Sequence, residues 1–327
     1  MTDPDPGVLR RDPSGDGTEV VLGIDIGGSS TRAVARHRNG TVGPIGRTEG
    51  GNPSTRRPEE IAAAVRSATH RALDGRRHPN VGAVVVGLAG LDEARRGELE
   101  ATIRAAVRAV GIQVEPLLRT DAEIAFAAGS ESPNGLVLIA GTGAIVARIG
   151  NRREVATVDG HGWQLGDVGS GYWLGAAVLR RVLEALDGRQ PPTAMTAAVL
   201  ERIGAHPEAD VQAEGGAGDD RWRIIRATLH MHPSEIAMFS GVALSGNDEA
   251  AHALVADAAG ELERSILALQ PVEHELIVLA GGLLREARLV DQLVARLGPR
   301  GLMTTRLDVE PVMGAARLAA DAAGWLR

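Results

Sequence analysis

An aspartate followed at once by a turn of glycines and hydroxyl residues stands near the start of the sequence. The segment reads Asp25-Ile26-Gly27-Gly28-Ser29-Ser30-Thr31 and follows a β-branched run that predicts a strand. Backbone N–H groups and hydroxyls in such a turn can bind phosphate. A carboxylate directly before a phosphate site is explained if Mg²⁺ lies between the two, held through water. The alternative is an ordinary hairpin turn in which Asp25 bonds its neighbours.

Two further glycine junctions follow predicted strands. Gly141-Thr142-Gly143 comes after the apolar run 135–140, and Gly281-Gly282 comes after 275–280. The first offers a second set of backbone N–H groups, and the second could let a base or ribose pass close to the backbone. Each alone is equally typical of a tight turn. The chain has no lysine, so the Walker motif is excluded. Three such junctions together favour a nucleotide site.

Asp121 stands at the end of the predicted strand 114–118, before a short predicted helix at 122–128. A carboxylate in that place could accept the proton of a substrate hydroxyl during phosphoryl transfer. The alternative, which spacing alone favours, is that Asp121 is the N-cap of the helix.

Strands and helices alternate along the whole chain, which predicts an α/β architecture with mixed sheets. The strand–turn–strand pattern at 20–36 recurs at 135–149, which suggests two domains of related topology. Residues 1–18 are rich in Asp, Pro and Gly and are predicted to form a flexible tail. The expected domains are 19–128 and 129–327.

Composition excludes several classes of function. The 327 residues include 42 acidic and 35 basic residues, for a net charge of −7, so a nucleic-acid partner is not expected. There is no cysteine, which excludes disulfides, cysteine-ligated zinc and iron–sulfur clusters. No apolar run is long enough to span a membrane, and the first residues do not resemble a signal peptide. We therefore expect a cytoplasmic protein.

The order of these motifs resembles that of the BadF/BadG-type ATPases, and within that group it is most similar to the N-acetylglucosamine kinases. The resemblance covers about residues 20–325. It implies membership of the actin/hexokinase/Hsp70 superfamily: two ribonuclease H-like domains, with mixed sheets flanked by helices and the nucleotide in the cleft between them. The motifs that carry it are Asp25-x-Gly27-Gly28-x-x-Thr31, Gly87-Leu-Ala-Gly90, Thr120-Asp121, Gly141-Thr142-Gly143, Gly166-Asp167-x-Gly169-Ser170, Ala280-Gly281-Gly282 and Gly314-Ala315-Ala316.

The resemblance implies an ATP-dependent kinase that phosphorylates the 6-hydroxyl of N-acetylglucosamine or a related amino sugar. Asp121 would be the catalytic base, and Asp25 would hold Mg²⁺ through water. The last helix, about 314–326, would pack back on the N-terminal domain, with Gly90 and the Gly314 region as hinges. A homodimer is expected as in related proteins. The residues expected to bind ATP are Gly27, Gly28, Ser29, Ser30, Thr31, Gly141, Thr142, Gly143, Gly281 and Gly282, and those expected at the sugar are Asn52, Gly90, Asp121, His161, Gly162 and Asp167.

The chain departs from the family pattern around the expected sugar site. His161 stands where a tryptophan is common, Val168 replaces a glutamate, and Ala89 replaces a serine. The sugar therefore stays open between N-acetylglucosamine, glucosamine, N-acetylmannosamine and N-acetylmuramic acid. The activators of 2-hydroxyacyl-CoA dehydratases and the zinc-containing ROK kinases need cysteines and are excluded. A non-catalytic nucleotide- or sugar-sensing protein is the alternative from another class.

Overall fold

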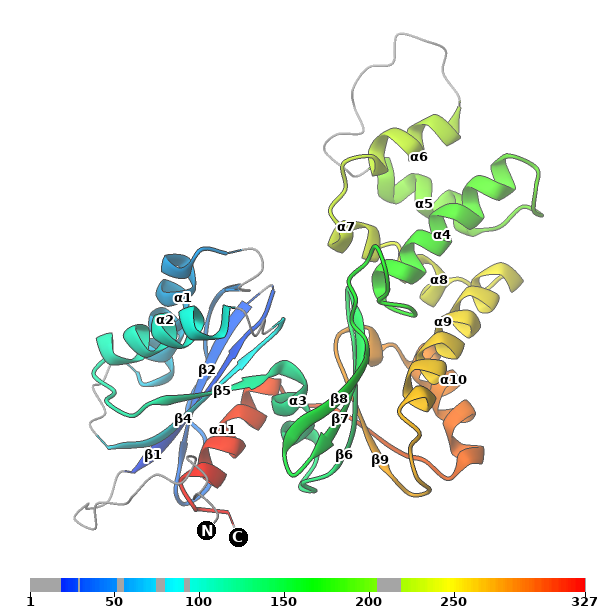
Figure 1. Ribbon diagram of the computed structural model, residues 1–327. Coiled ribbons are helices and arrows are strands. Elements are labelled where there is room, and N and C mark those ends of the chain that lie inside the picture. Colours follow the sequence, from blue (N-terminus) through cyan, green and yellow to red (C-terminus); the bar gives the residue numbers. More distant parts are fainter. Residues whose placement is uncertain are drawn as a thin grey trace. The chain divides into compact units, whose positions relative to one another are not determined.

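The computed structural model describes residues 19–28, 30–51, 56–74, 80–90, 95–204 and 219–326. They form two compact units. The first contains the described residues through Asn134, the short segment Ile149–Glu154 and the residues from Leu307 onward, and the second contains Gly135–Arg148 and Val155–Arg306. Each unit is built on a five-stranded sheet flanked by helices (Figure 1). This confirms the expected fold class of two domains with mixed sheets. The chain enters the first unit three times. The expectation was one boundary after residue 128 with the last helix packing back on the N-terminal domain, and it did not include the short return at Ile149–Glu154.

The sheet of the first unit has the strand order β3-β2-β1-β4-β5. Its central strand β1 pairs antiparallel with β2 and parallel with β4, and β4 pairs parallel with β5. Because β1 is paired on both sides, it is buried along its whole length. The strands are β1 (Val20–Ile26), β2 (Ser30–His37), β3 (Gly46–Glu49), β4 (Val81–Leu88) and β5 (Pro116–Thr120).

Alternation along β1 assigns its side chains to two helical layers. Leu22 and Ile24 join the core formed with α1 (Pro58–Ala72) and α2 (Arg96–Ala109). The odd-numbered residues face α3 (Asp121–Gly129) and α11 (Pro311–Ala322) on the other side of the sheet (Figure 1). Gly23 is required there, since a Cβ on it would lie 2.2 Å from the backbone nitrogen of Ala316. Asp25 is the next residue on this face.

The second unit repeats this arrangement, with the strand order β10-β9-β6-β7-β8 and parallel pairing of β6 with β9 and of β9 with β10. Its sheet and helices share one apolar core. The strands are β6 (Gly135–Ala140), β7 (Ala144–Gly150), β8 (Arg153–Asp159), β9 (Leu276–Ala280) and β10 (Met303–Arg306). The helices are α4 (Gly171–Leu186), α5 (Met195–Gly204), α6 (Asp220–Thr228), α7 (Pro233–Ala237), α8 (Ser240–Ser245), α9 (Glu249–Ala268) and α10 (Ala287–Leu297), with short 3₁₀ turns at Leu283–Arg285 and Gly298–Arg300. None of the helices in the described part of the chain has the length and apolar character needed to cross a bilayer.

Candidate active site

Asp25 lies at the end of β1, in the first unit, where its carboxylate is almost fully buried. Its Oδ2 accepts a hydrogen bond of 3.0 Å from Arg32, the residue opposite it on β2. Arg32 also pairs with Glu310 at 3.0 Å. Burial raises the pKa of Asp25, and the positive charge of Arg32 opposes that rise. The Asp25 carboxylate therefore lies in a low-dielectric environment, and the positive charge of Arg32 compensates its negative charge.

The β1–β2 turn that follows Asp25 is tight and open on its outer side. Gly27 N–H donates to the carbonyl of Ser30 at 3.1 Å, and a side chain at Gly28 would meet no other atom within 4 Å. Thr31 differs from the expectation that it contacts a ligand. Its side chain is fully buried, and its hydroxyl oxygen has no hydrogen-bond partner within the described part of the chain. Side chains along β2 point alternately to the two faces of the sheet, and Thr31 lies on the face that points into the core. Ser29 and Asn52 lie outside the described residues.

Asp121 is the first residue of α3. The N-cap is Thr120, whose hydroxyl accepts the N–H of Glu123 at 3.2 Å, so the alternative in which Asp121 caps the helix is wrong. Asp121 Oδ1 accepts instead from the N–H of Ala122 at 2.9 Å. The pKa of Asp121 is raised to about 6, mainly by burial; the hydrogen bond from Ala122 opposes the rise, and the negative charges of Asp25 and Glu154 add to it. A half-buried carboxyl with a pKa near neutrality is well suited to accept a proton.

The loop Gly141–Gly143 lies in the second unit, against the start of α4. Gly141 N–H donates to the carbonyl of Gly143 at 2.9 Å, which closes a tight turn. The carbonyls of Gly141 and Thr142 accept the N–H groups of Gly171 and Tyr172, in the first turn of α4. The loop is therefore held directly at a helix N-terminus, where the helix dipole favours an anion.

A cavity of about 340 Å³ joins this loop to the third glycine junction. It brings Gly141, Thr142 and Gly282 together, as the sequence predicted for a nucleotide site. Gly281 has a φ of +103°, and a Cβ there would lie 2.2 Å from the carbonyl oxygen of Ala140, so only glycine fits. Gly282 carries no such constraint. The remaining lining residues are Gly171, Ser234, Ala237, Met238, Ser240, Gly241, Leu244, Leu283 and Glu286.

The glycine-rich loop 160–169 is held by two aspartates. Asp159, which sequence analysis did not identify, accepts the N–H groups of Asp167 and Val168 at 2.7 Å each. It adopts a φ of +64°, an unfavourable conformation that these two hydrogen bonds offset. Asp167 accepts backbone hydrogen bonds from Ala144 and Gly162 in turn, and burial raises its pKa. The Asp167 carboxylate thus connects loop 160–169 to the segment that follows β6, at Ala144.

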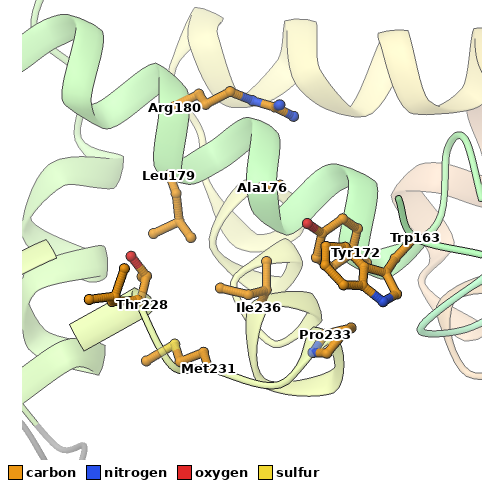
Figure 2. A pocket seen from close by; sticks show the side chains of 10 residues that line it. Trp163, Tyr172, Ala176, Leu179, Arg180, Thr228, Met231, Pro233 and Ile236 are labelled. Carbon is orange, nitrogen blue, oxygen red and sulfur yellow. The ribbon is translucent and has the colours of Figure 1, made fainter. Parts of the chain in front are cut away.

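Beside this loop lies a second cavity, of about 310 Å³, which the sequence did not predict (Figure 2). Trp163 and Tyr172 form one wall, with ring centroids 5.3 Å apart and ring planes inclined by 60°. Arg180 of α4 also lines this cavity, and Thr228 and Met231 lie across it from the two aromatic rings. His161, expected at the sugar, is exposed, and Gly162 has a φ of +82°. Neither His161 nor Gly162 lines this cavity.

The predicted site residues thus fall into two sets. The first unit holds Asp25, the β1–β2 turn, Gly90 and Asp121, and the second unit holds the loops at 141–143, 160–169 and 281–282. In the described part of the chain, no group of three or more histidine or acidic side chains could enclose a metal ion. A single carboxylate such as Asp25 suits Mg²⁺ that keeps most of its waters and is bound mainly by phosphates.

Comparisons with known proteins find one ATPase family and several sugar kinases that are similar to this chain. The profile of the BadF/BadG/BcrA/BcrD ATPase family matches residues 22–319. An N-acetyl-D-glucosamine kinase of Dictyostelium discoideum is 27% identical over 323 residues, which cover 92% of this chain and 98% of that protein. An N-acetylmuramic acid/N-acetylglucosamine kinase of Clostridium acetobutylicum is 29% identical over 193 residues, 56% of this chain and 60% of its own. The structure of a Chromobacterium violaceum protein assigned as an N-acetylglucosamine kinase has the same fold, with a TM-score of 0.74 at 24% identity, covering 92% of this chain and 99% of that one.

Proposed function

Because this chain belongs to the BadF/BadG/BcrA/BcrD ATPase family, we propose that it is an ATP-dependent kinase that phosphorylates the 6-hydroxyl of an amino sugar. N-acetylglucosamine is the first choice of acceptor, since two similar proteins are kinases for that sugar. Glucosamine, N-acetylmannosamine and N-acetylmuramic acid are the alternatives. We place the enzyme in the cytoplasm, where Mg-ATP is abundant, and expect a homodimer, which light scattering would test.

The observation that carries this proposal is Asp121. Its carboxylate stands at the start of a buried helix, and its pKa of about 6 leaves it mostly ionised at neutral pH. In that form it orients the sugar hydroxyl and accepts its proton as the phosphoryl group is transferred. A base of this kind typically contributes about 10²- to 10⁴-fold to the rate.

The glycine loops would bind the nucleotide. Backbone N–H groups of the β1–β2 turn and of Gly141–Gly143, other than those of Gly27 and Gly141 that donate within their own turns, would stabilise phosphate oxygens, and the N-terminus of α4 would add its dipole. The cavity at Gly282 has a volume suited to a base and ribose. Binding by preorganised backbone groups costs little reorganisation during transfer, which is the main source of catalysis in phosphoryl transfer.

Asp25 would hold Mg²⁺ through water. The ion, when bound, neutralises negative charge that builds up on the phosphates during transfer. Arg32 keeps the Asp25 carboxylate in a single orientation by its 3.0 Å hydrogen bond to Oδ2. The chain's own contribution is therefore a fixed, ionisable carboxylate at the mouth of the β1–β2 turn.

The direct test is ADP release from Mg-ATP with each amino sugar and with glucose. We expect turnover with N-acetylglucosamine or with one of the three alternatives. Turnover with another amino sugar would keep the mechanism and make His161 and Val168 the first residues to exchange. ATP binding without turnover on any sugar would contradict the proposal and favour the sensing alternative.

Replacing Gly282 by leucine is expected to raise the KM for ATP at least about tenfold, with little change in thermal stability. Gly282 has a φ of −64°, and a Cβ on it meets nothing within 4 Å. A leucine side chain is therefore tolerated by the fold but takes up space in the nucleotide cavity. Steady-state kinetics with varied ATP measure the effect.

Gly298 supplies the matched control. It is equally exposed, has a φ of −55°, and its Cβ would also meet nothing within 4 Å, but it does not line the cavity. Gly298→Leu should leave the KM for ATP unchanged. Equal effects of the two substitutions would show that the cavity at Gly282 does not bind ATP.

A further inference from the structure

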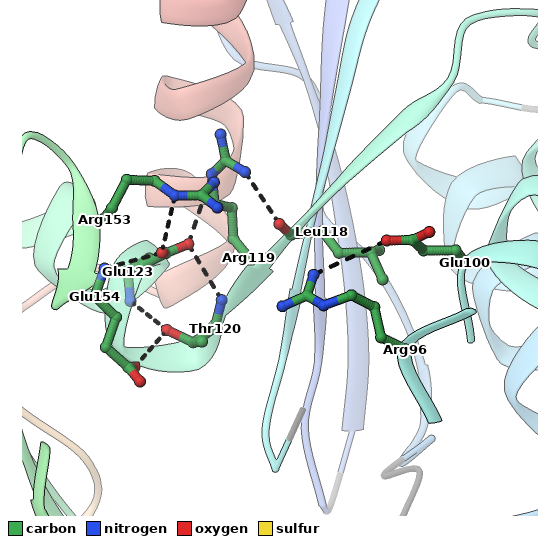
Figure 3. A network of polar contacts seen from close by, with 8 residues as sticks. All are labelled: Arg96, Glu100, Leu118, Arg119, Thr120, Glu123, Arg153 and Glu154. Carbon is green, nitrogen blue, oxygen red and sulfur yellow. Dashed lines mark hydrogen bonds and ion pairs between the residues drawn. The ribbon is translucent and has the colours of Figure 1, made fainter. Parts of the chain in front are cut away.

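A closed ring of hydrogen bonds lies immediately beside Asp121 (Figure 3). The hydroxyl of Thr120 donates to Oε2 of Glu154 at 2.8 Å and accepts the N–H of Glu123 at 3.2 Å. Glu154 N–H donates to Oε1 of Glu123 at 2.9 Å, and Thr120 N–H donates to Oε2 of Glu123 at 3.3 Å. The ring therefore joins the first turn of α3 to the start of β8, which is 34 residues away in sequence.

Glu123 is the most strongly held residue of this ring, because ion pairs and backbone hydrogen bonds both reach its carboxylate. Its side chain is only 5% exposed, and two arginines, Arg119 and Arg153, each place Nε 3.6 Å from one of its oxygens. Burial lowers the pKa of Arg119, and the charge of Arg153 lowers it further against the attraction of Glu123. Glu123 is thus a buried carboxylate with cationic partners, and both of its oxygens also accept backbone hydrogen bonds.

Glu154 differs from Glu123, because its hydrogen bond with the Thr120 hydroxyl does not require a charged acceptor. A neutral amide oxygen could accept the Thr120 hydroxyl equally well. Burial raises the pKa of Glu154, and the charge of Glu123 raises it further against the hydrogen bond from Thr120. Keeping the half-buried Glu154 carboxylate ionised therefore costs desolvation free energy. Its hydrogen-bond partner Thr120 is the N-cap of α3, and Asp121 is the residue that follows it.

We propose that Glu154 is a positioning residue for the phosphoryl-transfer reaction, which fixes the Asp121 carboxylate through Thr120 and strengthens it as a base by its own negative charge. This rests on the function proposed above for Asp121. The ionisable groups that act on Asp121 are Asp25 on β1 and Glu154 on β8, and both favour its protonated form. Asp25 is balanced by Arg32, whereas the structure records no cationic partner for Glu154 in the described part of the chain.

The test compares Glu154→Gln and Glu154→Ala in pH profiles of kcat/KM. The wild type should lose activity as the pH falls through about 6, because the base becomes protonated. Glu154→Gln keeps a hydrogen-bond acceptor for Thr120 but removes the negative charge that raises the pKa of Asp121. The acid limb of the pH profile of this variant should therefore move to lower pH. Glu154→Ala also frees Thr120 and should lower kcat about 10- to 100-fold, with the KM for ATP unchanged. Glu100→Gln is the control, since the Glu100 side chain on α2 is 42% exposed and lies 3.9 Å from Arg96, its partner in a weak ion pair.

A role confined to stability would give another pattern. Glu154→Gln and Glu154→Ala would then lower the melting temperature without moving the acid limb, which would overturn the proposal. Carbon-13 NMR titration of the Asp121 carboxyl in the nucleotide-free protein separates this question from the kinase assignment. Even if no sugar is phosphorylated, an unchanged titration of Asp121 in Glu154→Gln would refute the role of Glu154, and a shift to lower pH would support it.

Discussion

Replacing Asp121 by asparagine is expected to lower kcat about 10³-fold while ATP still binds. The amide has nearly the same size as the carboxylate and can accept the hydrogen bond from Ala122 N–H, so α3 should keep its start. It cannot accept a proton from the sugar hydroxyl at neutral pH. The assay is ADP release at saturating sugar and ATP, with nucleotide binding measured separately by calorimetry.

Asp220 offers a closely matched control. It is also the first residue of a helix, α6, directly after the N-cap, but its side chain is 38% exposed and pairs with Arg223 at 3.0 Å. Asp220→Asn should retain full activity. If Asp121→Asn also kept activity within a factor of a few, Asp121 could not be the base, and the mechanism proposed here would have to be abandoned.

The second large effect concerns the contact between α11 and α3. Replacing Gly314 by alanine would place a Cβ 1.8 Å from the carbonyl oxygen of Ile124 and 2.6 Å from the nitrogen of Ala128. Both are backbone atoms, so the two helices must move apart. We expect a loss of about 2–3 kcal/mol in the free energy of unfolding. Because α3 begins with Asp121, activity should fall as well. Urea unfolding measures the stability.

Gly97 makes this prediction specific to the helix contact. It lies in α2, in the same unit, and a Cβ on it would meet nothing within 4 Å. In such a position, alanine is expected to stabilise the helix by up to about 1 kcal/mol. Gly314→Ala should therefore lower the free energy of unfolding, and Gly97→Ala should raise it. A neutral or stabilising effect at Gly314 would show that α11 and α3 do not pack as closely as described.

The buried strands of the fold could be predicted from the sequence, whereas three of the four edge strands could not. Strand β6 is apolar and occupies the predicted range Gly135–Ala140. The three strands that the sequence analysis missed, β3, β8 and β10, each lie at the edge of a sheet. Edge strands are partly exposed and need no continuous apolar run, and β8 shows hardly any burial. Their signal is therefore absent from a hydrophobic pattern.

The same division holds for the candidate site. Glycines that follow an apolar run are visible in the sequence as turns, and Gly141, Thr142 and Gly282, which the sequence analysis singled out, line one cavity. Asp159 and Glu154 could not be foreseen, since their importance comes from partners that only the folded chain brings near. The buried hydroxyl of Thr31 is the converse case, in which a residue type suited to phosphate turns inward.

We propose that the wild-type protein transfers the γ-phosphoryl group of ATP to the 6-hydroxyl of an amino sugar. The most direct test is to incubate the protein with Mg-ATP and N-acetylglucosamine, or whichever amino sugar releases ADP fastest, and to identify the product by phosphorus-31 and proton NMR. We expect equal amounts of ADP and of a sugar 6-phosphate, with the phosphorus coupled to the two C6 protons. Free phosphate in place of a sugar phosphate, or a phosphate on another carbon, would contradict the proposal.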